Sequence, residues 1–174
     1  MNILITGGSS GIGKYLAENF CKKNTVIICS SAKKRILKKK NSTIADYRCD
    51  VSNEKSVRNF SKLLKKKLNK IDVIINCAGT YGAIGSFDEL NFKQWKKAIE
   101  INFFGTFLIC KYFVEFLQKS KVKKIINFSG GGAFNSFPNY SSYACSKAAV
   151  VRFSETVAEE LKSKKIYVNC IAPG

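Results

Sequence analysis

The stretch "NILITGGSSGIG", residues 2–13, decides the fold. It begins with a short, apolar, β-branched run, which predicts a strand buried on both faces. It continues into a turn with glycine at positions 7, 11 and 13. Glycine permits backbone conformations and close approaches that a Cβ atom would block. The turn is therefore either a flexible loop or a place where the backbone must come close to something else.

A helix is expected directly after this turn, with Ile12, Leu16 and Phe20 on its buried face. Where a strand leads through a glycine-rich turn into a helix, backbone amides and the helix dipole attract a phosphate. Glycine at a strand–helix corner can also be present only because the chain packs closely there, with no phosphate bound. The spacing T-G-x-x-x-G-x-G over residues 6–13 differs from the more general G-x-G-x-x-G pattern.

The rest of the chain alternates between short β-branched runs and longer amphipathic stretches. The further runs expected to be strands are 25–30, 72–76, 124–129 and 166–172, with 42–49 as a weaker candidate. The further stretches expected to be helices are 53–69, 92–118 and 143–163. This alternation predicts right-handed crossovers and a doubly wound parallel α/β sheet, with a helical layer on each face. The expected strand order is 3-2-1-4-5-6, within a single domain over residues 1–174.

Composition excludes several classes of protein. With 174 residues, 45% hydrophobic and 24% charged, the chain has the profile of one globular domain. No apolar run reaches the roughly 18 to 20 residues of a membrane span, and "MNILITGG" lacks the features of a signal peptide. We therefore expect a cytoplasmic protein with no membrane partner. Seven scattered cysteines and no histidine argue against a metal site or a disulfide framework.

The formal net charge of +18 first suggests a nucleic-acid partner. Arginine is the residue best suited to contact phosphates and bases, and the chain has only four: Arg35, Arg48, Arg58 and Arg152. The lysines are spread over nearly every expected helix, and the run at 33–40 is typical of a solvated helix face. We therefore expect no nucleic-acid partner.

Four further motifs lie where such a glycine turn predicts them. They are "CDV" (49–51), "NCAG" (76–79), "IN" (101–102) and "YACSK" (143–147), the last following "NFSGGGAF" (127–134). On these motifs, and on their order and spacing, the sequence resembles the short-chain dehydrogenase/reductase family over all 174 residues. The resemblance is to the short single-domain branch rather than to the extended sugar-nucleotide branch. It implies a Rossmann-type domain that binds NAD(P).

The resemblance also implies which residues bind the cofactor. They are Gly7, Ser9, Ser10, Gly11, Ile12, Gly13, Ser31, Asp50, Val51, Asn76, Ala78, Gly79, Tyr143, Lys147, Pro173 and Gly174. The glycine turn would hold the pyrophosphate, and Asp50 would bind the adenine amino group with Val51 beside the ring. Residues 76–79 would border the adenine-side ribose and steady the central sheet. The final Pro-Gly would form the turn beside the nicotinamide.

The catalytic residues implied by the resemblance are Tyr143, Lys147 and Asn102, and we expect Ser129 to act with them. Tyr143 would be the acid/base, and Asn102 would hold a water in a proton relay. A phenol has an ordinary pKa of about 10, which is too high for efficient proton transfer near pH 7. Lys147 follows Tyr143 by four residues, so the two share one helix face. We expect its ammonium to lower the pKa of Tyr143 and to bind the nicotinamide ribose.

The serine of the family's catalytic set is displaced in this sequence. It normally lies thirteen residues before the tyrosine, where this chain has Gly130. We expect Ser129 to take the role, with its hydroxyl within a few ångströms of the Tyr143 hydroxyl. The three glycines that follow it allow backbone conformations closed to other residues, so the offset could be absorbed locally. Ser141 and Ser142 are the alternatives, but we expect them to cap the helix.

The identity of the nicotinamide cofactor depends on the end of the second strand. Specificity for NAD usually requires an acidic residue there, but this strand ends in "CSSAKKR", residues 29–35, without a carboxylate. Ser31, Lys33, Lys34 or Arg35 could instead meet a 2′-phosphate. We therefore expect NADP(H), with NAD(H) as the alternative.

The function expected from the resemblance is hydride transfer between nicotinamide and a carbonyl or secondary-alcohol substrate. The alternatives are a non-catalytic dinucleotide-binding or regulatory module, and an epimerase or dehydratase of the extended branch. The pair Tyr143 and Lys147 favours the enzyme. Because family members are longer, we expect this chain to lack the last strand and the substrate lid. We therefore expect it to bind NADP(H) weakly and to turn over poorly or not at all. The full-length protein is expected to form a homodimer or homotetramer.

Overall fold

A computed structural model describes residues 1–31 and 44–173. Its centre is a six-stranded sheet in which every neighbouring pair is parallel. The strands are β1 (Asn2–Thr6), β2 (Thr25–Ser30), β3 (Ile44–Arg48), β4 (Val73–Asn76), β5 (Lys124–Phe128) and β6 (Tyr167–Ile171). Their order, β3-β2-β1-β4-β5-β6, confirms the expected doubly wound topology.

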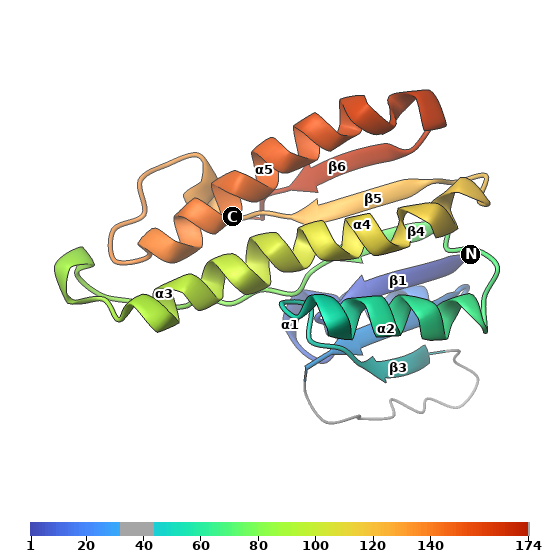
Figure 1. Ribbon diagram of the computed structural model, residues 1–174, viewed down its shortest axis with the longest axis horizontal. Coiled ribbons are helices and arrows are strands. Elements are labelled where there is room, and N and C mark those ends of the chain that lie inside the picture. Colours follow the sequence, from blue (N-terminus) through green and yellow to red (C-terminus); the bar gives the residue numbers. More distant parts are fainter. Residues whose placement is uncertain (32–43, 174) are drawn as a thin grey trace.

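Helices cover both faces of this sheet (Figure 1). They are α1 (Gly11–Phe20), α2 (Glu54–Lys65), α3 (Phe92–Ala98), α4 (Gly105–Gln118) and α5 (Ser141–Leu161). A π-helical segment, η2 (Ile99–Phe104), joins α3 to α4, and three short 3-10 turns are η1 (Phe87–Glu89), η3 (Gly131–Ala133) and η4 (Lys162–Lys164). In the described part of the chain no helix is long and apolar enough to cross a membrane.

Alternate residues of the central strands supply two separate cores. Leu4 of β1 and Ile74 of β4 pack with buried residues of α2 and α4. Ile3 and Ile5 of β1 pack on the other face, against α1. Because successive side chains of a strand point to opposite faces, a strand between two helical layers must be apolar at nearly every position. Burial on both faces therefore explains why the strands appear in the sequence as continuous apolar, β-branched runs.

The buried face of α1 differs from the expected one. Ile12 is 48% exposed and Phe20 is 37% exposed, whereas Gly13 and Ala17 are buried. A Cβ atom on Gly13 would lie only 2.6 Å from the carbonyl oxygen of Gly7. The small residues of α1 therefore face the sheet because the helix approaches the glycine turn too closely for larger ones.

The stretch 92–118, expected to be one helix, is helical throughout but is not uniform. It consists of α3, the π-helical segment η2 and α4 in succession. π-helical segments inside longer helices are rare and often occur at functional sites. Here the segment contains Asn102, which is buried.

The carboxyl ends of the parallel strands all lie at one edge of the sheet (Figure 1). The glycine turn follows β1, the "NCAG" motif begins at the end of β4, and Ser129 and Gly130 follow β5. In open α/β sheets, ligands bind outside this edge, where the strand order reverses. The fold therefore brings together the motifs that the sequence keeps far apart.

Candidate active site

Two adjoining cavities open at the carboxyl edge of the sheet. The larger has a volume of about 460 Å³ and the smaller of about 330 Å³. Both are within the size range of ligand sites, about 300 to 1,000 Å³. They share Gly7, Ser10, Gly79 and Thr80, so the glycine turn and the end of the "NCAG" motif form the boundary between them.

The glycine turn is held tightly against the sheet, so it is not a flexible loop. Gly7 has a φ of +66°, and a Cβ atom there would lie 2.8 Å from the Cα atom of Ala78. The Ala78 amide in turn donates to Thr6 Oγ1 at 3.1 Å. A Cβ atom on Gly11, by contrast, would meet nothing within 4 Å, and Gly11 lines the larger cavity. The turn therefore packs closely at Gly7 and presents open backbone to the cavity at Gly11.

Most of the expected cofactor-binding residues lie in these two cavities. The larger is lined by Gly7, Ser10, Gly11, Ile12, Gly13, Gly79, Tyr143, Lys147 and Pro173 of that set. The smaller is lined by Gly7, Ser9, Ser10, Ser31, Asp50, Val51, Ala78 and Gly79. Gly174, and the alternatives Lys33, Lys34 and Arg35, lie outside the described residues.

Asn76 is the exception among the described residues of that set, because it lines neither cavity. Its side chain is 3% exposed, and its Nδ2 donates to Asn127 Oδ1 at 2.9 Å. Asn127 lies opposite Asn76 on β5, and its own Nδ2 donates to Ser154 Oγ of α5 at 2.8 Å. Asn76 thus links the central strands, as expected, but the expectation that it borders the ribose does not match this position.

Asp50 and Val51 are held at the rim of the smaller cavity by their neighbours. Asp50 Oδ1 accepts from the Ser52 amide at 3.0 Å and from Ser52 Oγ at 2.7 Å. Val51 packs against Gly105 of α4, where an added Cβ atom would lie 2.8 Å from Val51 Cγ2. The backbone of this motif is therefore fixed before any ligand binds.

Tyr143 and Lys147 lie on the same side of α5, as their spacing predicts. The Lys147 Nζ atom is 5.6 Å from the centre of the Tyr143 ring. It donates to the carbonyl oxygen of Phe128 at 2.7 Å, and the residue is only 5% exposed. Burial penalises the ammonium and lowers the pKa of Lys147 to about 8.

The expected lowering of the Tyr143 pKa is wrong. Burial of the phenol raises the pKa of Tyr143 above its ordinary value, and electrostatic repulsion from the neighbouring Tyr81 raises it further, by a smaller amount. Desolvation disfavours a phenolate, and the ammonium of Lys147 is engaged by the Phe128 carbonyl. Without a ligand, Tyr143 is therefore protonated at neutral pH.

Ser129 does not have the expected orientation. It is 4% exposed, and its hydroxyl donates to the backbone carbonyl of Lys147 at 2.9 Å. The residue beside the Tyr143 hydroxyl is Gly130, where an added Cβ atom would fall on the phenol oxygen and lie 3.2 Å from Cζ. The strand end thus turns Ser129 toward the backbone of α5, and position 130 faces Tyr143 without a side chain.

The three glycines after Ser129 do not use the backbone freedom that glycine allows. None of the residues 130–132 has a positive φ, and Gly130 is extended, with a φ of −177°. Any residue can adopt that backbone conformation. The lack of a side chain at Gly130 matters because of the adjacent phenol, not because of backbone freedom.

Ser141 and Ser142 do not cap α5, contrary to expectation. Both lie inside the first turn, and the residue that precedes the helix is Tyr140, which makes no side-chain cap. Ser141 Oγ accepts from Trp95 Nε1 at 2.9 Å, and Ser142 Oγ donates to the Tyr81 carbonyl at 3.2 Å. They tie the start of α5 to α3 and to the loop after β4.

Asn102 is buried in η2, where hydrogen bonds engage both ends of its amide. Oδ1 accepts from the Thr80 amide at 2.8 Å, while Nδ2 donates to the Thr80 carbonyl and to Ser146 Oγ, each at 2.8 Å. The side chain therefore holds the backbone of Thr80 in place. The water-holding role expected for Asn102 stays a prediction.

Several residues at the site were missed by the sequence reasoning. In the larger cavity they are Cys77, Thr80, Tyr81, Phe128 and Gly130, and in the smaller Cys29, Ser30, Cys49, Thr80, Lys97 and Ile101. Thr80 and Tyr81 follow the "NCAG" motif directly, so their place after a strand end was a usable signal. Lys97 comes from α3, and nothing in its local sequence distinguishes it from the other lysines.

Comparisons with known proteins agree with this geometry. The sequence model of the short chain dehydrogenases matches residues 1–174. The 3-oxoacyl-acyl-carrier-protein reductase of Synechocystis is 30% identical over 181 residues, which covers 98% of this chain and 72% of the reductase. The solved structure of ElxO with NADP bound has a TM-score of 0.90 and 34% identity, covering 99% of this chain and 73% of ElxO.

Another relative is much longer than this chain. The short chain dehydrogenase pigC of Monascus ruber is 26% identical over 185 residues, which covers 99% of this chain but only 61% of pigC. The chain thus spans less than two thirds of the length of this curated relative.

Proposed function

The chain belongs to the short-chain dehydrogenase family, and on this basis we propose that it transfers a hydride between a nicotinamide cofactor and a carbonyl or secondary-alcohol substrate. The observation that carries the proposal is that Tyr143, Lys147 and the glycine turn line one cavity at the carboxyl edge of the sheet. A phenol and a buried lysine beside a phosphate-binding turn suit proton transfer next to a bound dinucleotide.

The cavities fit such a cofactor. Gly11 presents open backbone where a side chain would intrude, and the N-terminus of α1 would attract the pyrophosphate to the glycine turn. Asp50 and Val51 would bind the adenine, and Ala78 and Gly79 the adenine-side ribose. Bound there, the nicotinamide ring would supply or accept the hydride. Residues 1–174 would form a single NAD(P)-binding domain.

The chemistry of Tyr143 follows from its protonation. In the reductive direction its hydroxyl gives a proton to the carbonyl oxygen while a hydride reaches the carbonyl carbon, so the C=O π bond is replaced by an O–H and a C–H bond. The raised pKa keeps the phenol protonated before this step. Lys147 has three N–H donors, of which one is used by the Phe128 carbonyl. The others are free to bind the nicotinamide ribose.

We propose NADP(H) as the preferred cofactor. Residues 29–31, which are the end of β2 and the residue after it, line the smaller cavity and carry no carboxylate that would accept both ribose hydroxyls. ElxO, a similar protein, has been solved with NADP bound. NAD(H) is the alternative.

We also propose that the protein acts on a small molecule and self-associates through α4 and α5, as a homodimer or as part of a homotetramer. These helices lie side by side on one face of the sheet (Figure 1). Phe104, the last residue of η2, is 45% exposed, and Phe107 of α4 is 40% exposed. Phe107 packs against Phe153 of α5 at a ring-centre distance of 6.0 Å. Exposed aromatic clusters of this kind are enriched in protein interfaces.

A non-catalytic dinucleotide-binding module is the second candidate. The observation in its favour is that position 130, which faces Tyr143, has no hydroxyl, while Ser129 is turned toward the Lys147 carbonyl. The two candidates differ in whether dinucleotide binding is accompanied by turnover.

The experiment that separates them begins with titrations of NADPH and NADH, followed by assays of NADPH oxidation with a panel of aldehydes and ketones. We expect weak binding of NADPH and slow turnover of at least one carbonyl. Tyr143→Phe should lower that turnover by about 10²- to 10⁴-fold, the usual contribution of a general acid, with NADPH affinity unchanged. Binding without any turnover would favour the module, and a folded protein that binds neither dinucleotide would contradict both candidates.

A further inference from the structure

Tyr81 is the second phenol of the larger cavity. It lines this cavity together with Tyr143, Lys147 and Gly130. Its ring centre lies 5.0 Å from that of Tyr143, with an angle of 46° between the two planes. Tyr81 comes from the loop after β4, and Tyr143 from the first turn of α5, so the pair is assembled only in the folded protein.

The backbone on both sides of Tyr81 is held in place. Thr80 is bound by two hydrogen bonds to the Asn102 amide, each of 2.8 Å. The Tyr81 carbonyl accepts from Ser142 Oγ at 3.2 Å. Gly82 has a φ of +73°, and an added Cβ atom there would lie 2.6 Å from Ala98 Cβ. The loop on both sides of Tyr81 is therefore held by contacts with α3, η2 and α5.

The other hydroxyls of the larger cavity, apart from Tyr143, are engaged or lie elsewhere. Ser129 donates to the Lys147 carbonyl. Ser10 and Thr80 lie at the boundary with the smaller cavity, which both of them also line. The Tyr81 hydroxyl makes no hydrogen bond to any residue that the structure describes, so it is available to a ligand.

A hydrogen-bond donor beside Tyr143 has a specific use in the proposed reaction. The carbonyl oxygen of a substrate has two lone pairs, and the proton of Tyr143 takes one of them. A donor to the other lone pair fixes the direction of the carbonyl and stabilises the charge that develops on its oxygen. At Gly130 no side chain can do this, because the Tyr143 phenol occupies the space of a Cβ atom.

We propose that Tyr81 is the substrate-orienting residue: its hydroxyl donates to the carbonyl oxygen that Tyr143 protonates, in place of a serine hydroxyl. The inference rests on the proposed oxidoreductase function. It extends that function by assigning the second donor to the loop after β4 rather than to the end of β5.

The test compares Tyr81→Phe with Tyr140→Phe. Tyr140 belongs to the same ring cluster, with its ring centre 5.5 Å from that of Tyr81, but it does not line the cavity. With the best carbonyl of the panel and NADPH, Tyr81→Phe should lower kcat by about 10²-fold, the typical loss of one oxyanion donor. NADPH affinity should stay at the wild-type value, and Tyr140→Phe should leave turnover unchanged.

A second measurement does not depend on turnover. NMR titration of ring-labelled tyrosine should show a lower pKa for Tyr143 in Tyr81→Phe than in the wild type, because a neighbouring phenol is removed, and no such change in Tyr140→Phe. An unchanged Tyr143 pKa in Tyr81→Phe would show that the two phenols do not face each other as in the structure, and would overturn the inference.

The two proposals fail in different ways. If the wild type oxidises NADPH with a carbonyl and Tyr81→Phe does so equally fast, only the inference about Tyr81 is overturned. If the wild type turns over no carbonyl at all, the proposed function fails and the role of Tyr81 fails with it.

Discussion

Gly130 puts main chain, rather than a side chain, against the hydroxyl of Tyr143. A serine at this position would match the spacing of the family motif, yet the structure has no room for its Cβ atom. Ser129 cannot compensate, since its hydroxyl is bound to the Lys147 carbonyl. The absence of a Cβ atom at position 130 therefore determines which residue beside Tyr143 can orient a substrate.

The first prediction is that Gly130→Ser lowers activity instead of restoring a typical serine. The new Cβ atom forces Tyr143 to move, and a displacement of about 1 Å at a catalytic group can cost roughly 10²-fold in rate. Overpacking of this kind also costs about 1 to 3 kcal/mol of stability. The measurements are kcat/KM with NADPH and a carbonyl, and urea denaturation.

Gly131→Ala is the matched control, because an added Cβ atom at Gly131 meets nothing within 4 Å. This variant should keep the activity and stability of the wild type. A rise in turnover in Gly130→Ser would show that a serine does fit beside Tyr143.

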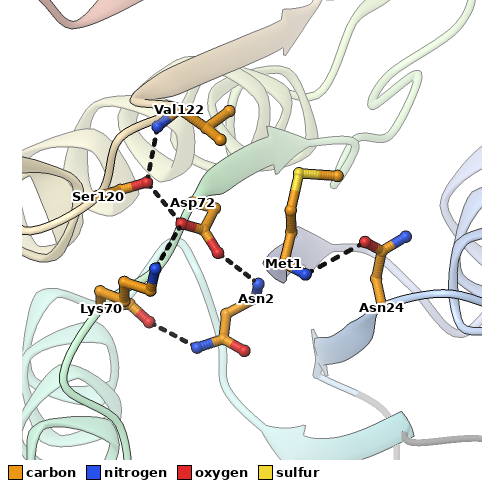
Figure 2. Close-up of polar contacts among 7 residues, drawn as sticks. All are labelled: Met1, Asn2, Asn24, Lys70, Asp72, Ser120 and Val122. Atoms are coloured by element: carbon orange, nitrogen blue, oxygen red, sulfur yellow. Dashed lines mark hydrogen bonds and ion pairs between the residues drawn. The ribbon is translucent and has the colours of Figure 1, made fainter.

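At the scale of elements, the amino ends of β1 and β4 are joined by one buried carboxylate (Figure 2). Asp72, 3% exposed, accepts from the Asn2 amide at 2.7 Å and from Ser120 Oγ at 2.5 Å, and Lys70 Nζ lies 3.5 Å away. Ser120 Oγ in turn accepts from the Val122 amide at 2.9 Å, just before β5. The carboxylate therefore fixes the end of the sheet opposite the cavities.

We expect Asp72→Ala to lower the free energy of unfolding by about 2 to 3 kcal/mol, because buried donors lose a charged acceptor. Burial acts to raise the pKa of Asp72, but the hydrogen bonds from Ser120 and the Asn2 amide, with the Lys70 ammonium, leave it below its ordinary value. The stabilisation is therefore complete above the unfolded pKa of about 3.9. It is lost as the pH falls through the lower folded pKa.

The measurement is urea denaturation of the wild type and Asp72→Ala at several pH values. The difference between them should be constant around neutral pH and shrink below about pH 4. Glu160→Ala, which removes an exposed carboxylate from α5, controls for the change in net charge and should stay within about 0.5 kcal/mol of the wild type. A difference for Asp72→Ala that grows on acidification would contradict this account.

On the scale of the whole molecule, the cavities lie at the carboxyl edge of the sheet, and α4 and α5 cover one of its faces (Figure 1). Phe104 and Phe107 are exposed beside them. Ring contacts join the half-buried Phe153 of α5 to Phe103 of η2 and to the exposed Phe107 of α4. An interface there would leave the carboxyl edge of the sheet open to cofactor and substrate.

We predict that the protein is at least dimeric and that Phe104→Glu combined with Phe107→Glu makes it monomeric, because charges are unfavourable in the core of an interface. The measurement is size-exclusion chromatography with light scattering. Phe20→Glu on α1, where the side chain is 37% exposed, is the matched control and should leave the oligomer intact. A wild-type monomer, or an oligomer unchanged by the double substitution, would exclude this surface.

The topology and the location of the candidate site could be predicted from the sequence. Alternating β-branched and amphipathic runs predicted the parallel sheet and its order, and the motifs after β1, β4 and β5 predicted a site at the carboxyl edge. The four-residue spacing likewise predicted that Tyr143 and Lys147 share one side of α5. These features depend on local periodicity and on strand ends, which are visible in one stretch of sequence at a time.

Only the tertiary structure decided the direction of the Tyr143 pKa shift, the partner of Ser129 and the place of Tyr81 beside Tyr143 in the cavity lining. Each depends on contacts between segments distant in the sequence: burial of a phenol among other rings, or a strand end placed against α5. The buried side of α1 was decided in the same way, by the approach of Gly13 to Gly7. Hydrogen-bond partners and desolvation are properties of the packed interior, and no periodicity in the chain encodes them.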